Sequence, residues 1–467
     1  MVSSSEIKDA QAANNWENHS KPSTIGPFMV VCISGLVTGS VATARGRDLL
    51  GLFIVLLGFA TLIILLSQHK DARLRNLIIL AFLLRTGLAI THAYIMPLPD
   101  SGADALTFER LGWQTAKAWL DGEIAPSLSG AYLYSLLIGV LYYLFGRIPL
   151  VAQFTNVLLG TFTVYFTWKL ALLISKGRSP ALIATLIAAL FPTLNLYSAI
   201  TMRESAIVFF TALSIYCFFL WLQRGRLSWM FGAVILLLPA SILHSGMVFI
   251  EIVYLFFFCF YRPRKEKWVA FGINTIIALF LLLFVVIVFG DWLTGKLPQD
   301  IRLLLSPDYL GQRITIAARD RAAYLSGFVP RSIGDMLLQT PLRILYFLYT
   351  PFIWMVSTPT DIVGFFDALL YIFLSIFALK GLVYFWHKDK LLFWGIVLIL
   401  AVFLVVFAWG TSNYGTAIRH RQKMVWFLAI PAAIGLARGP GWKWSYPVKK
   451  TSADKNSGKE VAGPLNL

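Results

Sequence analysis

The amino-acid sequence predicts an all-α polytopic membrane protein, and its composition, its long apolar runs and its charge pattern lead to this prediction. The chain of 467 residues is 58% hydrophobic and 13% charged, whereas soluble domains are about 25% charged. Stretches such as 49–66, 271–289 and 391–409 run for about 18 residues with few or no charges, long enough to cross a bilayer as a helix. They do not alternate apolar and polar residues, as barrel strands would, so they are expected to be helices.

About twelve such spans are predicted, with both termini inside. Two further apolar stretches, 132–146 and 341–357, are interpreted as in-plane or re-entrant helices on the outer, periplasmic face. The first is short, and the second contains Arg343 and Pro351. The domain at 25–438 is flanked by a disordered cytoplasmic segment, 1–24, and by a basic cytoplasmic tail, 439–467. The predicted spans are 25–43, 49–67, 76–96, 148–170, 180–200, 205–222, 228–243, 247–261, 268–290, 361–385, 391–409 and 424–438.

The net charge of +17 is explained by membrane topology rather than by a nucleic-acid partner. Lys and Arg collect in cytoplasmic loops of membrane proteins. The short loop with Arg45 and Arg47 is the exception, since it faces out. No cleavable signal peptide is evident, so the first spans are expected to anchor the chain in a bacterial inner (plasma) membrane. The basic segments predicted to face the cytoplasm are 70–75, 176–178, 224–226, 262–267 and 387–390.

This topology places most of the unusual polar residues on the outer side of the membrane. The three cysteines lie in apolar runs and show neither a disulfide framework nor metal-ligand spacing. A convergence of polar segments on one side marks a candidate site more reliably than one motif does. The outward segments are 97–130, 200–204, 244–246, 291–340 and 410–423.

The first outward loop carries two candidate catalytic carboxylates, Asp100 and Asp104. They are four residues apart, so on a helix they share a face. Apolar residues at 105, 108, 111 and 119 predict a helix that lies in the membrane interface. A carboxylate just above the membrane can take a proton from an acceptor hydroxyl. The alternative is that Asp100 caps the helix and Asp104 is solvated.

Two short outward turns add polar residues next to apolar runs. Arg203 and Glu204 lie where a predicted span emerges, a depth at which ionisable residues are costly and usually functional. The alternative is an internal ion pair that orients the turn. His244 separates two apolar runs and is either a proton carrier or a polar turn residue.

Two outward segments carry basic residues that suit a phosphate group. The guanidinium group presents a planar fork of donors that matches phosphate. The alternatives are surface ion pairs in the long loop and snorkelling to lipid headgroups in the last segment. The candidates are Arg313, Arg319 and Arg321 in 291–340, and Arg419, His420 and Arg421 in 410–423.

The spacing of Arg419 and Arg421 limits how they can act together. Residues two apart on a regular helix point about 200° away from each other. Both can therefore reach one phosphate only if 413–421 is an extended or turn segment. Gly415 makes a non-helical backbone plausible there.

The layout of these motifs resembles the GT-C superfamily of membrane glycosyltransferases, well over 76–225 and loosely elsewhere. The first loop lacks the commoner Asp-Glu pair, and Glu204 stands where many relatives have Asp, so the choice of base between Asp100 and Asp104 stays open. The residues that carry the resemblance are Asp100–Leu111, the stretch Tyr132–Gly146 ending in Leu-Phe-Gly, Phe191-Pro-Thr-Leu-Asn-Leu-Tyr with Arg203-Glu204, and Gly415-Thr-Ala-Ile-Arg-His-Arg.

The resemblance implies transfer of a sugar from a polyprenyl-phosphate-linked donor to a glycan or lipid acceptor at the outer face, in cell-envelope polysaccharide or glycoconjugate synthesis. Asp100 or Asp104 would be the general base. Arg203, Arg419 and Arg421, with His420, would bind the departing phosphate. Glu204, His244 and the arginines of the long loop would support them. No cofactor is certain, although clustered carboxylates would suit a divalent metal ion.

Two other functions remain open at this stage. A polysaccharide polymerase or ligase would use a pyrophosphate-linked oligosaccharide and would rely on the outward Arg and His residues. A flippase or transporter of lipid-linked sugars would show inverted repeats and broken helices with midplane charges. The sequence shows no repeat, and Arg85 is nearly the only charge in the middle of a predicted span.

Overall fold

The computed structural model describes residues 46–438 except 271, 274, 281–282, 284–310, 313, 317 and 319. The described residues form an all-α fold, as predicted, together with a two-stranded antiparallel hairpin, β1 (Tyr261–Arg262) and β2 (Lys267–Trp268). The predicted span at 25–43, the end of that at 268–290 from residue 284 onward, both predicted tails, Arg313 and Arg319 lie outside the described residues.

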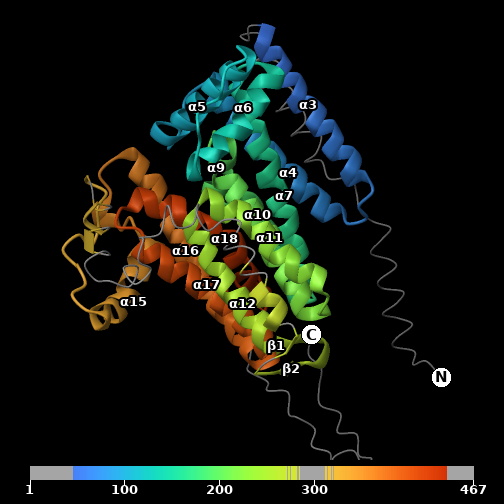
Figure 1. Cartoon of the computed structure of the whole chain (residues 1–467), viewed down its shortest axis with the longest axis vertical. Coiled ribbons are helices and arrows are strands. Elements are labelled where there is room, and N and C mark those ends of the chain that lie inside the picture. The colour runs from blue at the N-terminus through green and yellow to red at the C-terminus, as the bar shows by residue number, and fades with distance from the viewer. Residues whose placement is uncertain are drawn as a thin grey trace, which may run out of the picture.

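Most of the longer helices follow one another with short connections, except that 261–332 separates α12 from α15 (Figure 1). Short 3-10 turns precede α6 and α12, at Gly130–Leu133 and Ser245–Phe249. The helices are α3 (Gly46–Ser67), α4 (Ala72–Tyr94), α5 (Ala103–Leu120), α6 (Tyr134–Phe145), α7 (Pro149–Ser175), α8 (Arg178–Leu190), α9 (Pro192–Ala199), α10 (Glu204–Arg224), α11 (Leu227–Leu243), α12 (Ile250–Phe260), α15 (Ile333–Tyr349), α16 (Pro359–Lys388), α17 (Lys390–Trp409) and α18 (Tyr414–Ala437).

In the described part of the chain, six helices are long and apolar enough to cross a membrane: α3, α4, α7, α10, α16 and α17. The pair α8–α9, bent by 51° at its break, makes up to seven. The protein is therefore an integral membrane protein, but the prediction of about twelve spans is wrong. Helices α11 and α12 have 17 and 11 residues, which is short for a span. Helix α18 is long enough, but Arg419, Arg421 and Lys423 lie in its first half.

The break between α8 and α9 follows from Pro192, whose ring nitrogen has no hydrogen to give to the carbonyl of Ala188. The buried guanidinium of Arg85 in α4 replaces that donor. Its Nη2 donates to the carbonyl of Ala188 at 3.1 Å, and its Nη1 donates to those of Ala189 and Ala81 at 3.3 and 3.0 Å. The mid-span charge thus satisfies backbone carbonyls that water cannot reach at this depth.

Helices α16 and α18 pack so closely that their backbones come into contact at two glycines. A Cβ atom on Gly381 would lie 1.9 Å from the carbonyl oxygen of Pro431, and one on Gly435 would lie 2.1 Å from that of Phe377. Only glycine allows such an approach at these two positions. This close packing fixes the position of α18, which carries much of the candidate site.

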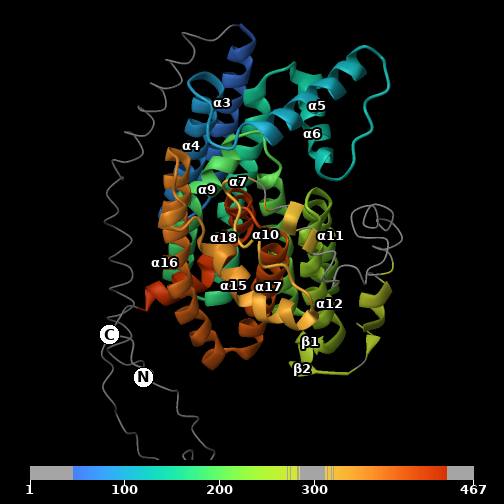
Figure 2. The ribbon, with the colours of Figure 1, turned by 90° about the vertical axis from the view of Figure 1, so that its left-hand side faces the viewer.

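The predicted interfacial helix and the predicted short helix are both present and pack on each other. Helix α5 buries Ala105 and Phe108, the residues of the predicted apolar stripe that face the core. Gly112 of α5 faces Ile138 of α6 at close range. In Figures 1 and 2, α5 and α6 lie at one end of the molecule and the β1–β2 hairpin lies at the other.

Segments predicted to face the cytoplasm gather on one side of the molecule. Asp71 receives two hydrogen bonds from the guanidinium of Arg178, at 2.9 and 3.0 Å. A cavity of about 730 Å³ brings together Lys176, Glu266 and Lys390, which come from three of these segments.

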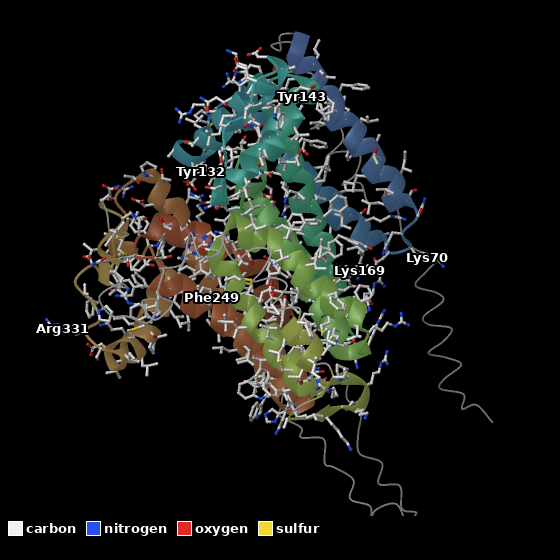
Figure 3. All side chains as sticks on the ribbon, in the orientation of Figure 1. Lys70, Tyr132, Tyr143, Lys169, Phe249 and Arg331 are labelled. Carbon is white, nitrogen blue, oxygen red and sulfur yellow. The ribbon has the colours of Figure 1, made fainter. Side chains whose placement is uncertain are left out.

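Segments predicted to face outward contact one another in a different part of the molecule. The backbone N–H of Tyr324 donates to the carbonyl of Ser412, and that of Tyr414 donates to Ala322, both at 2.9 Å. Figure 3 shows Tyr132 and Arg331 on one side of the molecule and Lys70 on the other.

We expect Ser129 and Ser326 to face the same, non-cytoplasmic side of the membrane, because the segments around them belong to the outward group. Both residues are exposed. Single cysteines placed there in a cysteine-free background should react with an impermeant thiol reagent added to intact cells. A cysteine at the exposed Gln68, beside Lys70, is the matched control and should stay unlabelled. Labelling of only one of the two serine positions would contradict this topology.

Candidate functional site

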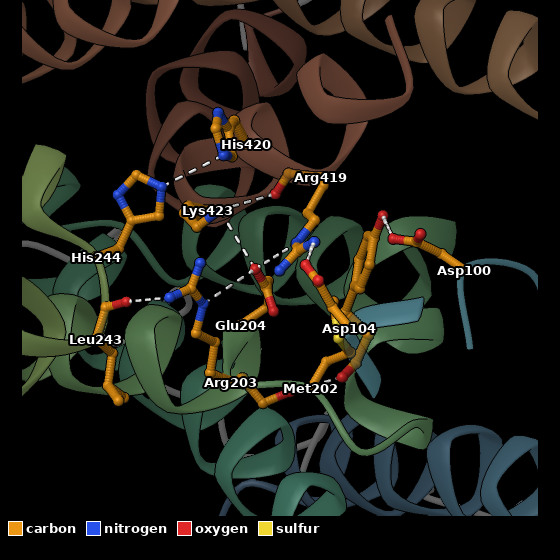
Figure 4. A network of polar contacts seen from close by, with 12 residues as sticks. Asp100, Asp104, Met202, Arg203, Glu204, Leu243, His244, Arg419, His420 and Lys423 are labelled. Atoms are coloured by element: carbon orange, nitrogen blue, oxygen red, sulfur yellow. Dashed lines mark hydrogen bonds and ion pairs between the residues drawn. The ribbon is translucent and has the colours of Figure 1, made fainter. Parts of the chain in front are cut away.

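A buried carboxylate, Glu204, lies at the centre of a polar cluster (Figure 4). The Nε of Arg419 donates to its Oε1 at 2.7 Å. The Nζ of Lys423 and the Nε of Arg203 lie 3.7 and 4.0 Å from the same oxygen. Glu204 is 0% exposed, so it is charged in this place only because several cations surround it. These four residues and Asp104 are called the Glu204 cluster below.

The turn that carries Arg203 is held by a buried side chain from a distant helix. Helix α9 ends at Ala199, and the backbone is not helical again until α10. Asn156 of α7 donates from its Nδ2 to the carbonyls of Ile200 and Met202, both at 2.7 Å. The hydroxyl of Tyr134 donates to the Oδ1 of Asn156 at 3.0 Å, which orients the amide. The position of the turn therefore depends on α7 as well as on its own residues.

Arg419 joins the first outward loop to the Glu204 cluster. Its Nη1 donates to the carboxylate of Asp104, while its Nε binds Glu204 on the other side. Asp104 lies in the first turn of α5 and its side chain is 55% exposed. The guanidinium thus bridges one exposed and one buried carboxylate that are 100 residues apart in the sequence.

Asp100 and Asp104 do not share a helical face, so this prediction is wrong. Asp100 precedes α5 and has a positive φ of 59°, which a short polar side chain tolerates. Gly102 is the residue that precedes the first turn of α5, so the capping alternative for Asp100 is also wrong. Instead, the carboxylate of Asp100 accepts a hydrogen bond from the hydroxyl of Tyr197 at 2.8 Å.

Asp100 differs from Asp104 in its electrostatic surroundings. Asp100 is exposed, but desolvation by the protein around its carboxyl raises the pKa of this group above its ordinary value. The hydrogen bond from Tyr197 and the charge of Arg419 oppose this shift, whereas the charges of Glu204 and Asp104 add to it. A carboxyl whose pKa is raised toward the working pH is better suited to accept a proton in catalysis.

Two histidines join the end of α11 to α18. The Nε2 atoms of His244 and His420 lie 3.3 Å apart. The Nδ1 of His420 lies 3.1 Å from the hydroxyl of Thr411. Phe407 contacts both rings. Sequence analysis left His244 as either a proton carrier or a turn residue, and its place beside His420 and the Glu204 cluster brings it into the candidate site.

Arg421 lies away from Arg419, which corrects the expectation that both could reach one phosphate. The segment is helical from Tyr414 and is capped by the Asn413 side chain, so residues two apart point in nearly opposite directions. The Nε and Nη2 of Arg421 donate to the carboxylate of Asp367 at 3.0 and 2.6 Å, in the buried interior between α16 and α18.

Arg321 also lies outside the Glu204 cluster. Its Nη1 donates to the carboxylate of Asp361 at 2.6 Å and to the hydroxyl of Tyr414 at 2.7 Å. These contacts fasten the loop after 320 to the start of α16. The contacts of Arg321 therefore support the alternative interpretation, in which it forms an ion pair in a folded loop.

Three residues of the site were not among the predicted ones: Lys423, Tyr197 and Asn156. Lys423 lies four residues after Arg419, so a helical reading of 414–437 would have placed both on one face. Tyr197 and Asn156 act through distant partners, and their spacing in the sequence carries no signal for those contacts. Within the described residues, no group of three or more His, Cys, Asp or Glu side chains is arranged to hold a metal ion.

No protein-family model matches the sequence, and no curated protein matches it either. The class of the protein therefore follows from the molecule alone. It is an all-α integral membrane protein whose predicted outward segments meet in a buried, highly charged cluster.

We expect Asp367→Leu to destabilise the protein by about 3–5 kcal/mol, because it leaves the buried guanidinium of Arg421 without its counter-charge. The double variant Asp367→Leu, Arg421→Met should recover much of this loss, since both charges are removed. Denaturant unfolding in detergent measures the difference. The control is Arg178→Met in the exposed pair with Asp71, which should cost no more than about 1 kcal/mol. Equal losses in the single and double variants would contradict this account.

Proposed function

We propose that this protein is a membrane glycosyltransferase that moves a sugar from a polyprenyl-phosphate-linked donor to a glycan or lipid acceptor at the outer face of the membrane. The observation that carries the proposal is the convergence of the first-loop carboxylates with Arg203 and Arg419. The order of the motifs along the chain, which resembles the GT-C superfamily, supports the same assignment. The product would belong to a cell-envelope polysaccharide or glycoconjugate.

In the proposed reaction the acceptor hydroxyl oxygen attacks the anomeric carbon of the donor sugar. A new carbon–oxygen bond forms as the bond from the anomeric carbon to the phosphate oxygen breaks. The polyprenyl phosphate leaves with that electron pair, and the hydroxyl proton passes to a carboxylate. Asp100 is the better candidate for this base. Its partner is the neutral hydroxyl of Tyr197, whereas Asp104 is bound to the cationic Arg419.

The departing phosphate would bind to Arg419 and Arg203, which contact α5 at Asp104 and at the ring of Phe108 respectively. The Nη2 of Arg419 has no hydrogen-bond partner among the described residues and would donate to the phosphate, and release of the exposed Asp104 would free Nη1 as well. Glu204 and Lys423 would remain in place and would hold Arg419 at the correct position. An arginine that is already desolvated stabilises developing negative charge without much reorganisation.

A second candidate function rests on the histidine pair. A polymerase or ligase with a pyrophosphate-linked donor would rely on outward Arg and His residues, and His244 with His420 lies beside Arg203 and Lys423 (Figure 4). Purified protein supplied with labelled donors separates the two candidates. Transfer from the monophosphate-linked donor alone supports the first function, and transfer from the pyrophosphate-linked donor alone supports the second.

The transporter alternative is weakened by the role of Arg85. A transporter would use a broken helix and a midplane charge to bind its substrate. The guanidinium of Arg85 instead donates to three backbone carbonyls, two of them at the α8–α9 break. The donors of Arg85 are therefore used by backbone carbonyls, including those that the helix break leaves without a partner.

We predict that Asp100→Asn lowers the transfer rate by roughly 10²–10⁴-fold while donor binding and membrane insertion persist, because the amide cannot take up the proton. The matched control is Asp121→Asn, an exposed aspartate at the other end of α5. Transfer from a labelled polyprenyl-phosphate donor is the measurement. A large loss in Asp104→Asn without one in Asp100→Asn would assign the base to Asp104, and wild-type rates in both would remove the acidic loop from the chemistry.

The pH dependence of transfer gives a second test of Asp100. Activity requires the ionised carboxylate, so it should fall as the pH drops through the raised pKa of Asp100. The hydrogen bond from Tyr197 favours the ionised form, so Tyr197→Phe should raise that pKa further and move the acid limb of the pH–rate profile to higher pH. Tyr143→Phe, an exposed tyrosine on α6, is the control. An unmoved acid limb in Tyr197→Phe would mean that Asp100 is not the titrating group.

A further inference from the structure

A second cavity lies beside the first outward loop and is distinct in character from the Glu204 cluster. Its volume is about 380 Å³, which falls in the range of small-ligand pockets, about 300–1,000 Å³. Several residues of its wall are close in sequence to the proposed catalytic and phosphate-binding residues. Ser101 in its wall follows Asp100, Ala105 follows Asp104, and Thr201 comes two residues before Arg203. We call it the Gln153 cavity.

The Gln153 cavity contains a buried hydrogen-bond acceptor. Gln153 of α7 is 2% exposed, and its Oε1 has no hydrogen-bond partner among the described residues. A buried polar atom without a partner costs free energy, and native structures contain few of them. Gln153 lines the cavity, so a donor group of a molecule bound against it would give this carbonyl oxygen a partner.

The same cavity also offers hydrogen-bond donors. The Nδ1 of His92 accepts from the backbone N–H of Leu98 at 3.2 Å, so in the neutral imidazole the proton lies on Nε2. His92 lines the cavity together with the buried hydroxyl-bearing residues Ser101 and Thr201. Amide, imidazole and hydroxyl groups can each bond to a ligand hydroxyl group.

The charges in the wall of the cavity cancel each other. The Nε and Nη2 of Arg147 donate to the two carboxylate oxygens of Glu109, each at 2.9 Å. These two parallel hydrogen bonds pair the guanidinium with the carboxylate, so each charge has its counter-charge within the wall. The wall therefore suits an uncharged ligand rich in hydroxyl groups, while Leu106 and Pro149 add apolar surface for C–H groups. The Glu204 cluster, in contrast, suits an anion.

We propose that the Gln153 cavity binds a neutral pyranose ring of one of the two substrates, a site that would receive the sugar while the Glu204 cluster receives the phosphate. The assignment to a substrate rests on the glycosyltransferase function proposed above. The ring can belong to the acceptor or to the donor, because both present the same hydroxyl chemistry. Kinetics with the two substrates varied separately distinguish these sources.

The test begins with direct binding, which does not depend on turnover. Purified full-length protein in detergent is mixed with methyl glycosides of glucose, galactose, mannose and their N-acetylated forms, and saturation-transfer NMR reports which of them bind. Gln153→Leu removes the acceptor atom and should lower the affinity for the bound glycoside about 3- to 10-fold, the value of one hydrogen bond. Gln223→Leu, an exposed glutamine at the other end of the bundle, is the matched control and should bind as the wild type does.

Two further measurements separate a binding role from a structural one. Gln153→Leu should unfold at the same temperature as the wild type or higher, because it removes a buried acceptor that lacks a partner. In the transfer assay it should raise the KM of one substrate about 3- to 10-fold with little change in kcat, and the substrate affected identifies the owner of the ring. Thr201→Val changes the same cavity wall and should also lower the affinity for the glycoside. It replaces Gln153→Leu if that variant does not fold.

The outcomes for the cavity and for the proposed function are distinguishable. Absence of a signal from every glycoside, or equal signals in wild type and in both wall variants, would overturn the sugar site even if the protein transfers sugars. A glycoside signal that is weakened by Gln153→Leu but not by Gln223→Leu would establish the site even if no polyprenyl donor is used, and would then count against the transferase alone. Asp100→Asn should bind the glycoside normally, because its carboxyl belongs to the chemistry and not to the cavity wall.

Discussion

The ion pair between Glu204 and Arg419 is the interaction on which the arrangement of the site depends. A fully buried carboxylate is stable only beside cations that are themselves well placed, since removing either partner leaves an unpaired charge in a region of low dielectric. This requirement ties three parts of the chain together: the turn before α10, the first half of α18 and, through Asp104, the start of α5. The backbone contacts of Gly381 and Gly435 with α18 and α16 keep Arg419 at the depth where this pair forms.

Buried arginines serve a second, structural purpose in this fold. Arg85 donates to carbonyls at the break between α8 and α9. Arg421 donates to the carbonyls of Leu348 and Thr350, beyond its pair with Asp367. Arg343 donates to the carbonyl of Phe328 and stacks on Trp409. In each case a guanidinium supplies donors to backbone carbonyls at a helix break, at a helix end or in a loop. Such backbone is tolerated in a membrane protein only where its polar groups find partners.

The first outward loop separates two environments with different chemistry. The Glu204 cluster on one side holds a dense set of opposite charges, where the proposed donor phosphate would bind. The Gln153 cavity offers neutral donors and acceptors and one self-satisfied ion pair. Asp100 directly precedes Ser101 of the cavity wall and is held by Tyr197 rather than by a cation. A substrate with a charged phosphate and an uncharged sugar has parts that match both environments.

The sequence by itself determined the all-α fold class, the membrane character of the chain and most of the residues that meet in the Glu204 cluster. Apolar runs and basic loops follow from the energetics of lipid and water, which act on each segment separately. Several segments that the charge pattern assigns to the outer side contact one another. Only the tertiary structure decided the number of spans, the separation of Arg421 from Arg419 and the partner of Asp100. These depend on a proline break, on a helix that begins at Tyr414, and on contacts such as that between Tyr197 and Asp100, across 97 residues. Such contacts leave no local pattern, because they arise from the packing of whole helices rather than from the spacing of neighbouring residues.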